Sequence, residues 1–96
     1  MDVRFEWDGS KAASNAVKHG ITFEEAQTVF ADPTAVIVPD EWHSDVEERE
    51  IIIGHSDQQR LLFVVFVERV VRTVQIISAR SATRKERLDY EQQFHP

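Results

Sequence analysis

The sequence predicts an α+β domain in which an antiparallel sheet of about five strands carries two N-terminal helices on one face, and a further helix ends the chain. Apolar residues recur with the period of a strand or of a helix in successive segments, in the order strand, helix, helix, four strands, helix. The joins between the last three strands, residues 56–60 and 68–71, are short, which favours an antiparallel meander. The 96 residues can bury one hydrophobic core and not two, so we expect a single domain over residues 1–96.

The start of the chain predicts the first strand and the first helix. Residues 3–7 alternate between apolar and charged side chains, which is the period of a half-buried strand. The next segment has apolar residues along one side of a helix, and Asp8 or Ser10 can cap its first turn. Gly20 lies where a left-handed C-terminal cap is favoured, so the first helix is predicted to end there.

Two capping patterns predict the other helices. Thr22 is followed three residues later by Glu25, which is the pattern of a capping box, and Asp32–Pro33 ends the helix that it opens. The same pattern occurs over residues 83–86, so a last helix is predicted over residues 84–94.

The remaining strands are short apolar segments bounded by polar turns. They are predicted at residues 34–38, 47–55, 61–67 and 72–79. The strand over 61–67 is apolar at every position, so it is predicted to be central and buried on both faces. The face opposite the first two helices then needs a cover, because an exposed apolar patch is costly in a monomer. The last helix, a second copy of the chain or a partner protein could provide it.

The charge of the chain is unevenly distributed. The formal net charge is −6, which argues against a protein that is held on nucleic acid as a whole. Residues 60–87 nevertheless carry seven basic and two acidic side chains, and four of the eleven basic residues fall between positions 80 and 87. Such a cluster needs an oppositely charged partner to offset its self-repulsion, so we interpret it as a binding site for a polyanion.

Several other classes of protein are disfavoured. Without cysteine, the chain can form neither disulfides nor a thiolate zinc site. The loop at residues 40–45 contains carboxylates and a histidine but no recognisable ligand spacing, so no metal or other cofactor is predicted. The acidic start is unlike a signal peptide, and no apolar run approaches the ~20 residues of a membrane span. We therefore expect a soluble cytoplasmic protein that does not engage a membrane.

Several segments together carry a family resemblance. They are residues 5–8, Lys11, Asn15, residues 18–26, 43–44, 47–49, 76–80 and 82–83. In these segments, and over nearly the whole chain, the sequence resembles the BrnT toxins. Two positions depart from the usual pattern. Gln75 stands where a basic residue is expected, which weakens one phosphate contact, and Gln59–Arg60 replaces a Gly-Arg turn.

The resemblance implies a RelE-like fold and the activity of a ribonuclease toxin from a type II toxin-antitoxin system. Such a toxin cuts messenger RNA and arrests growth. A cognate, BrnA-like antitoxin neutralises it, and the complex represses its own operon, so the chain is expected to meet operator DNA only through the antitoxin. A homodimer and a toxin-antitoxin hetero-oligomer are both compatible with the sequence.

The resemblance and the chemistry of RNA cleavage single out three candidate catalytic residues, His19, Arg49 and Arg80. RNA supplies its own nucleophile, the 2′-hydroxyl, so the protein needs proton-transfer groups and fixed positive charge rather than a metal. His19 is the candidate for proton transfer, because the unperturbed pKa of imidazole lies near neutrality. Arg49 and Arg80 are the candidates for fixed charge, because guanidinium is always protonated and binds phosphate oxygens in pairs.

Each of these three residues also has a structural explanation. His19 lies at a predicted helix end, where the helix dipole favours cations. The two arginines can instead pair with nearby acids. The acids considered are Glu48 for Arg80, and Asp45 or Glu47 for Arg49.

Four further basic residues are predicted to contact RNA. They are Lys18, Arg84, Lys85 and Arg87. The alternative is that they form ordinary solvated helix surfaces. His55 and His95 are assigned as a turn residue and a tail residue.

A second function is compatible with the sequence. It is a catalytically weak binding module that forms an antitoxin complex and assists repression of the operon. The negative net charge and the two-sided apolar strand at residues 61–67 favour this alternative.

Overall fold

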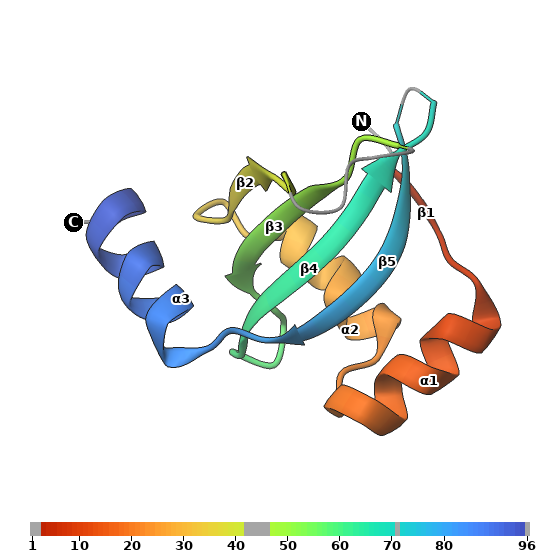
Figure 1. Ribbon diagram of the computed structural model, residues 1–96, viewed down its shortest axis with the longest axis horizontal. Helices are drawn as coiled ribbons and strands as arrows, with labels where there is room; N and C mark the ends of the chain where they lie inside the picture. Colours follow the sequence, from red (N-terminus) through yellow and green to blue (C-terminus); the bar gives the residue numbers. More distant parts are fainter. Residues whose placement is uncertain (1–2, 42–46, 71, 96) are drawn as a thin grey trace.

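A five-stranded sheet forms the centre of the molecule, with two helices packed behind it and a helical segment at the C-terminus (Figure 1). The computed structural model describes residues 3–41, 47–70 and 72–95. The elements in chain order are β1 (Arg4–Glu6), α1 (Gly9–His19), α2 (Phe23–Thr28), the 3₁₀ turn η1 (Val29–Ala31), β2 (Val36–Pro39), β3 (Glu50–His55), β4 (Leu61–Glu68), β5 (Thr73–Ser81), α3 (Arg84–Asp89) and the π-helical turn η2 (Tyr90–Phe94). The predicted α+β class and order of elements are confirmed.

The strands lie in the order β1-β5-β4-β3-β2. The strands β3, β4 and β5 form the predicted antiparallel meander, with β4 at the centre of the sheet, and β2 pairs antiparallel with β3. The first strand departs from the antiparallel prediction, because β1 pairs in parallel with β5 and makes the sheet mixed. Alternation over residues 3–7 identifies a strand but not its partner, and here the partner is the last strand of the chain.

The helix ends follow local capping rules. The Asp8 side chain accepts a hydrogen bond from the Lys11 N–H at 3.0 Å and begins α1. Gly20 has a φ of 70°, in the left-handed region, so the predicted glycine cap is confirmed. At the other end of the chain, Thr83 and Glu86 form a complete capping box that begins α3.

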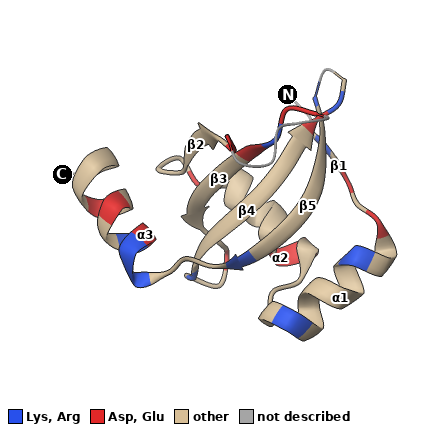
Figure 2. Cartoon of the chain, in the orientation of Figure 1, with Lys and Arg blue, Asp and Glu red and all other residues tan. Residues whose placement is uncertain are grey.

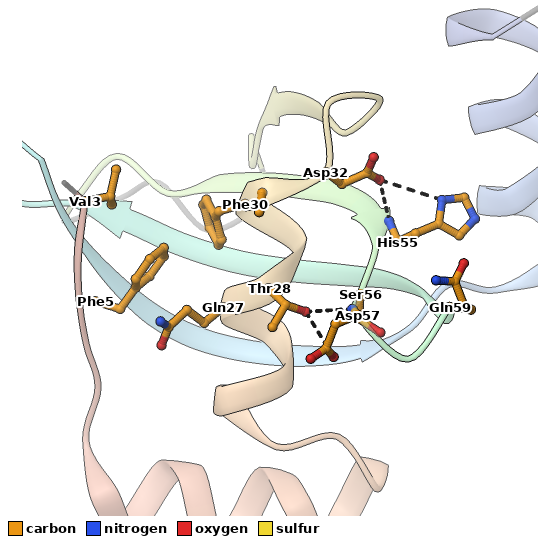
Figure 3. Close-up of a pocket in the computed structure, with 11 residues that line it drawn as sticks. Val3, Phe5, Gln27, Thr28, Phe30, Asp32, His55, Ser56, Asp57 and Gln59 are labelled. Carbon is orange, nitrogen blue, oxygen red and sulfur yellow. Dashed lines mark hydrogen bonds and ion pairs between the residues drawn. The ribbon is translucent and has the colours of Figure 1, made fainter. Parts of the chain in front are cut away.

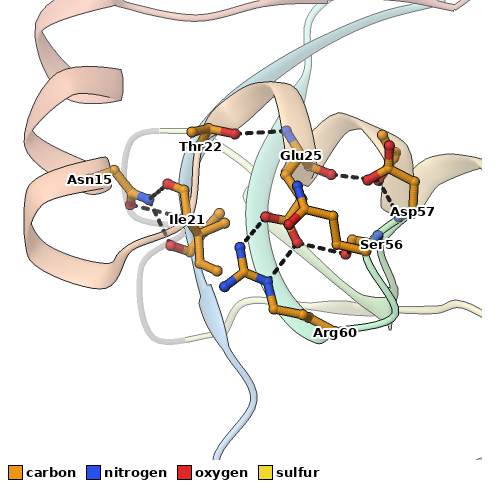
Figure 4. A network of polar contacts seen from close by, with 10 residues as sticks. Asn15, Ile21, Thr22, Glu25, Ser56, Asp57 and Arg60 are labelled. Atoms are coloured by element: carbon orange, nitrogen blue, oxygen red, sulfur yellow. Dashed lines mark hydrogen bonds and ion pairs between the residues drawn. The ribbon is translucent and has the colours of Figure 1, made fainter.

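The capping box predicted at the start of α2 is only half present. The Thr22 hydroxyl accepts from the Glu25 N–H at 3.0 Å, as predicted. The Glu25 side chain does not return to the backbone of Thr22, because its carboxylate pairs with Arg60 and Ser56 in the interior (Figure 4). An ion pair between the buried Glu25 and the exposed Arg60 of the β3–β4 turn therefore displaces a local cap.

The two faces of the sheet differ in how well they are covered. The face toward α1 and α2 contains the larger core, with Ile21, Phe23, Leu62, Val64 and Ile76 almost fully buried. On the opposite face a smaller cluster is formed by Ile53, Leu61 and Tyr90, and the neighbouring Ile51, Phe63 and Ala82 are only partly buried. We call this second face the open face. Tyr90 shows that the last helical segment covers part of it.

Candidate functional site

The side chain of Arg80 lies on the open face near the end of β5. Arg80 is in register with Phe63 on β4, and the preceding Ala79 is buried against the helices. Because side chains alternate along a strand, burial of Ala79 directs Arg80 to the other side. Figure 2 shows the resulting basic end of β5 beside the basic first turn of α3.

Two neighbours fix the Arg80 guanidinium. Its Cζ lies 4.0 Å from the centre of the Phe63 ring, which is a cation–π contact. Its Nη1 and Nη2 donate to Glu86 Oε1 and Oε2 at 2.8 and 2.9 Å, and Nη1 also donates to the Ser81 carbonyl at 3.2 Å. The acid that pairs with Arg80 is therefore Glu86, across the strand-to-helix junction, and not Glu48.

This pairing leaves one edge of the guanidinium available. Glu86 and the Ser81 carbonyl take three of the five N–H groups of Arg80. The Nε–H and the second Nη2–H have no acceptor in the part of the chain that the structure describes. The Arg80 side chain is 34% exposed, so this edge can reach an external anion.

The ion pair keeps both partners charged. Hydrogen bonds from Arg80, assisted by the Thr83 N–H, outweigh burial and hold the pKa of Glu86 below its ordinary value. The same hydrogen bonds raise the pKa of Arg80 above its ordinary value. The junction therefore carries a permanent cation whose orientation is set by a permanent anion.

Three of the predicted RNA-binding residues surround the junction. Arg84, Lys85 and Arg87 all lie on α3, and all three are exposed. Lys85 Nζ lies 3.8 Å from Asp89 Oδ2 in a solvated pair, which contributes little stability. The structure thus places these three side chains beside Arg80 at one end of the sheet.

His19 and Lys18 lie elsewhere. They are exposed at the C-terminal end of α1, which lies at the lower right of Figure 1, on the helical side of the molecule. This end of α1 is held to β5 by Asn15, whose amide donates to the Ala79 carbonyl at 2.7 Å. The guanidinium of the next residue, Arg80, lies on the other side of the sheet. The structure therefore does not bring the predicted proton-transfer residue to the predicted cation.

Arg49 shares the open face with Arg80 but lies at the other end of the sheet. It precedes Ile51 and Ile53 by two and four residues, which puts it about 13 Å from Ile53 along the strand. Its Nε lies 3.7 Å from Glu47 Oε1, one of the two partners considered from the sequence. The other partner, Asp45, falls outside the described residues, as does most of the acidic loop at residues 40–45.

A second group of titratable side chains gathers at the end of β3. The His55 ring lies 6.0 Å from the Tyr90 ring, and the Tyr90 ring lies 4.6 Å from that of His95. His55 Nδ1 lies 3.7 Å from Asp32 Oδ2. Sequence reasoning assigned both histidines to turn and tail. No local pattern could have found this group, because its members come from the residue after η1, the end of β3 and the last helical segment.

Asp32 is the most strongly held member of this group. Its carboxylate accepts from the His55 N–H at 2.7 Å, and from the N–H and hydroxyl of Thr34 at 2.9 and 2.8 Å. Burial alone would raise the pKa of Asp32, but these hydrogen bonds lower it below its ordinary value. Asp32 is therefore an anion beside the imidazole of His55.

A cavity of about 1070 Å³ lies on the outer side of α2 and η1 (Figure 3). Val3, Phe5 and Phe30 line one end, and Asp32 and Asp57 line the other. Lys and Arg are missing from its described lining residues, so the cavity is poorly suited to a phosphate. The cationic junction on the open face is the better candidate for a polyanion.

The residues that the structure describes contain no cluster of three or more His, Asp or Glu side chains arranged to hold a metal ion. They also contain no helix with the length and hydropathy needed to cross a membrane.

The fold and the junction define a small α+β protein with a cationic edge suited to a chain of phosphates. Comparison with known proteins identifies the family. The model of the BrnT ribonuclease toxins of type II toxin-antitoxin systems matches residues 7–86, so the chain belongs to the BrnT family. A search among curated proteins gave no match.

A solved structure supports the same fold. The chain is similar to the Brucella abortus ribonuclease toxin BrnT, whose crystal structure was determined at 1.1 Å resolution. The TM-score is 0.67 at 24% sequence identity, and the alignment covers 85% of this chain and 99% of that one. At this identity the likeness establishes the fold, and the predicted α+β arrangement is confirmed.

Proposed function

We propose that this chain is an endoribonuclease toxin that cuts messenger RNA and so inhibits translation and growth. Cleavage proceeds by attack of the RNA 2′-hydroxyl on the adjacent phosphate, without a metal ion. A cognate antitoxin neutralises the toxin, and the chain meets operator DNA through the antitoxin complex. Membership of a ribonuclease toxin family supports the general activity.

The observation that carries the proposal is the unused edge of the Arg80 guanidinium. Glu86 and Phe63 hold this group on the open face while its Nε–H and one Nη2–H face outward. Two parallel N–H donors match two oxygens of a phosphate. Charge builds on those oxygens in the phosphorane, and one such fixed donor group is worth about 10²- to 10³-fold in rate.

The neighbouring cations extend this contact along the RNA. Arg84, Lys85 and Arg87 are exposed beside Arg80, and we assign them to flanking phosphates. Arg49 shares the open face at its far end and is assigned to the same strand of RNA. Lys18 and His19 remain the candidates taken from the sequence, and their place in the helical layer makes His19 the weaker proton-transfer group.

The activity test uses purified chain free of antitoxin and a single-stranded RNA in excess chelator. We expect cleavage with 2′,3′-cyclic phosphate ends, and a loss of about 10²-fold or more in Arg80→Ala. Arg4→Ala, an exposed arginine of β1, is the matched control and should retain activity. Equal cleavage by Arg80→Ala and wild type would remove Arg80 from the site.

A salt titration separates the enzyme from a binding module. About four phosphate contacts to single-stranded RNA predict a slope of log affinity against log salt near about −3. A slope near zero together with absent cleavage would favour the binding module. Rescue of growth by the protein encoded next to the toxin gene would identify the antitoxin.

A further inference from the structure

We propose that His55 is the general base of the RNA-cleaving site, an inference that rests on the ribonuclease function proposed above. It is carried by the position of His55 on the face that holds Arg80, by the carboxylate that lies against its ring, and by the accessibility of the imidazole.

His55 and Arg80 project from the same side of the sheet. Ile53, Phe63 and Arg80 lie in register across β3, β4 and β5, and Ile53 belongs to the open-face cluster. His55 follows Ile53 by two residues, so alternation directs it to the same face. Its ring contact with Tyr90, another member of that cluster, agrees with this direction.

The separation suits a nucleotide between the two side chains. Two strand spacings and a two-residue step put the Cα atoms of His55 and Arg80 about 12 Å apart. The Arg80 guanidinium leans over Phe63, toward β3, which shortens the gap between the functional groups. Both side chains are partly exposed, His55 at 41% and Arg80 at 34%. RNA held by Arg80 can thus present its sugar toward His55.

Asp32 orients the imidazole. Its carboxylate faces Nδ1 of His55 at 3.7 Å and is itself fixed by three hydrogen bonds, so the ring turns Nε2 away from Asp32 (Figure 3). A carboxylate next to one ring nitrogen stabilises the imidazolium that forms when the other nitrogen takes a proton. Asp32 is a positioning residue in this arrangement.

The other described histidines fit the role less well. His19 lies in the helical layer. His95 Nε2 is 2.7 Å from the Thr34 carbonyl, so this nitrogen donates its proton to a backbone acceptor and cannot take one. The charged or titratable groups that face His55 are Asp32, just after η1, and Tyr90 of η2, whose ring in turn contacts His95.

The proposed step conserves atoms and charge. The Nε2 lone pair of neutral His55 takes the 2′-hydroxyl proton while O2′ attacks phosphorus, and the bond from phosphorus to the 5′ oxygen breaks. The departing 5′ oxygen takes a proton from water, and the hydroxide that remains is neutralised by the imidazolium. The products are a 2′,3′-cyclic phosphate and a 5′-hydroxyl end.

The test is the single-turnover cleavage of a short single-stranded RNA by wild type, His55→Ala, His55→Gln and, as control, Arg4→Ala. We expect the cleavage rate constant to fall about 10²- to 10⁴-fold in both His55 variants and to stay near wild type in Arg4→Ala, a change at an exposed residue of β1. Added imidazole should restore part of the activity of His55→Ala, since that variant leaves space for it, and should not help His55→Gln. RNA affinity should change little.

Variant kinetics test the role of Asp32. Because the carboxylate holds the imidazole in place, Asp32→Asn should lower kcat about 10-fold while KM for RNA stays near wild type, and Asp32→Glu should restore part of kcat. A purely structural role of Asp32 would instead lower the melting temperature together with kcat, with no recovery in Asp32→Glu.

The outcomes separate the two proposals. Cleavage by wild type with full kcat in His55→Ala overturns the assignment of His55 and leaves the ribonuclease function standing. Loss in His55→Ala without imidazole rescue, together with a lowered melting temperature, shows a structural role and also overturns it. Absence of cleavage by wild type removes the proposed function and the inference with it.

Discussion

Glu86 binds both terminal nitrogens of Arg80 while its Oε1 also accepts the Thr83 N–H at 2.9 Å. One carboxylate therefore orients the guanidinium at the end of β5 and completes the cap of α3. The orientation of Arg80 and the first turn of the last helix are thereby linked, although the sequence suggested only the cap.

The first prediction concerns this carboxylate. Glu86→Gln keeps the size of the side chain but can accept only one of the two hydrogen bonds from Arg80. We expect kcat/KM for RNA cleavage to fall about 10-fold, because an Arg80 guanidinium held by one hydrogen bond in place of two makes a weaker contact with the phosphate in the transition state. Glu91→Gln, an exposed change in η2, is the control for lost charge and should leave kcat/KM unchanged. Equal values for both variants would argue against orientation by Glu86.

The second prediction concerns the ion pair between Glu25 and Arg60. The Glu25 side chain is only 2% exposed, and hydrogen bonds from Arg60 lower its pKa despite burial (Figure 4). Arg60→Ala leaves this buried carboxylate without its ion-pair partner, so we expect a lower free energy of unfolding at pH 7. Urea denaturation measures the change.

The pH dependence of that loss has a definite sign. In wild type, the lowered pKa of Glu25 stabilises the fold above the ordinary glutamate pKa, and this contribution disappears as pH falls through the folded-state pKa. In Arg60→Ala, burial without a partner raises the pKa of Glu25, so protonation favours the folded state. The difference between the two proteins should therefore shrink from pH 7 to about pH 4. A constant difference would contradict the pairing.

The third prediction concerns Asn15, which joins α1 to the sheet. Its amide donates to the carbonyls of Ile21 and Ala79, and its oxygen accepts the Ala79 N–H (Figure 4). Asn15→Ala leaves three buried backbone groups without partners, which should cost about 2–3 kcal/mol. Ser14→Ala, on the exposed side of α1, should cost less than about 0.5 kcal/mol in the same denaturation experiment.

The fourth prediction concerns Gln59, at the position where the family pattern has glycine. Gln59 has a φ of 64°, which a side chain disfavours and glycine accepts freely. Gln59→Gly should raise the free energy of unfolding by about 0.5–1 kcal/mol. Gln58→Gly, one residue earlier in the same turn, should lower it by removing a side chain where φ is not positive. The melting temperatures of the two variants, each compared with that of wild type, test this prediction.

Local features of the fold could be predicted, whereas long-range ones could not. Asp8, Gly20 and Thr83 act within one helical turn, so their caps can be read from neighbouring residues. Glu25 shows the limit of this reasoning, because its carboxylate leaves the expected cap for a partner 35 residues away. The parallel pairing of β1 with β5 could not be predicted for the same reason, because the two strands are far apart in the sequence.

The candidate site shows the same division. Arg80 could be identified from the charge cluster and the family pattern, since both lie within a few residues of it. The contact between His55 and Asp32 could not, because 23 residues separate them and neither belongs to a recognised motif. Chemistry assembled from distant segments becomes visible only in the folded chain.

The pairing of β1 with β5 also bears on when the toxin becomes active during synthesis. Residues 4–6 pair in register with residues 73–75, the Arg4 N–H donates to the Arg72 carbonyl, and the Arg80 junction follows a few residues later. A nascent chain that ends before these residues lacks both the β1–β5 pairing and the cationic site, because β1 can pair only after β5 has been synthesised. A folded cationic site is thus available only after residues 80 to 86, which form it, have emerged from the ribosome.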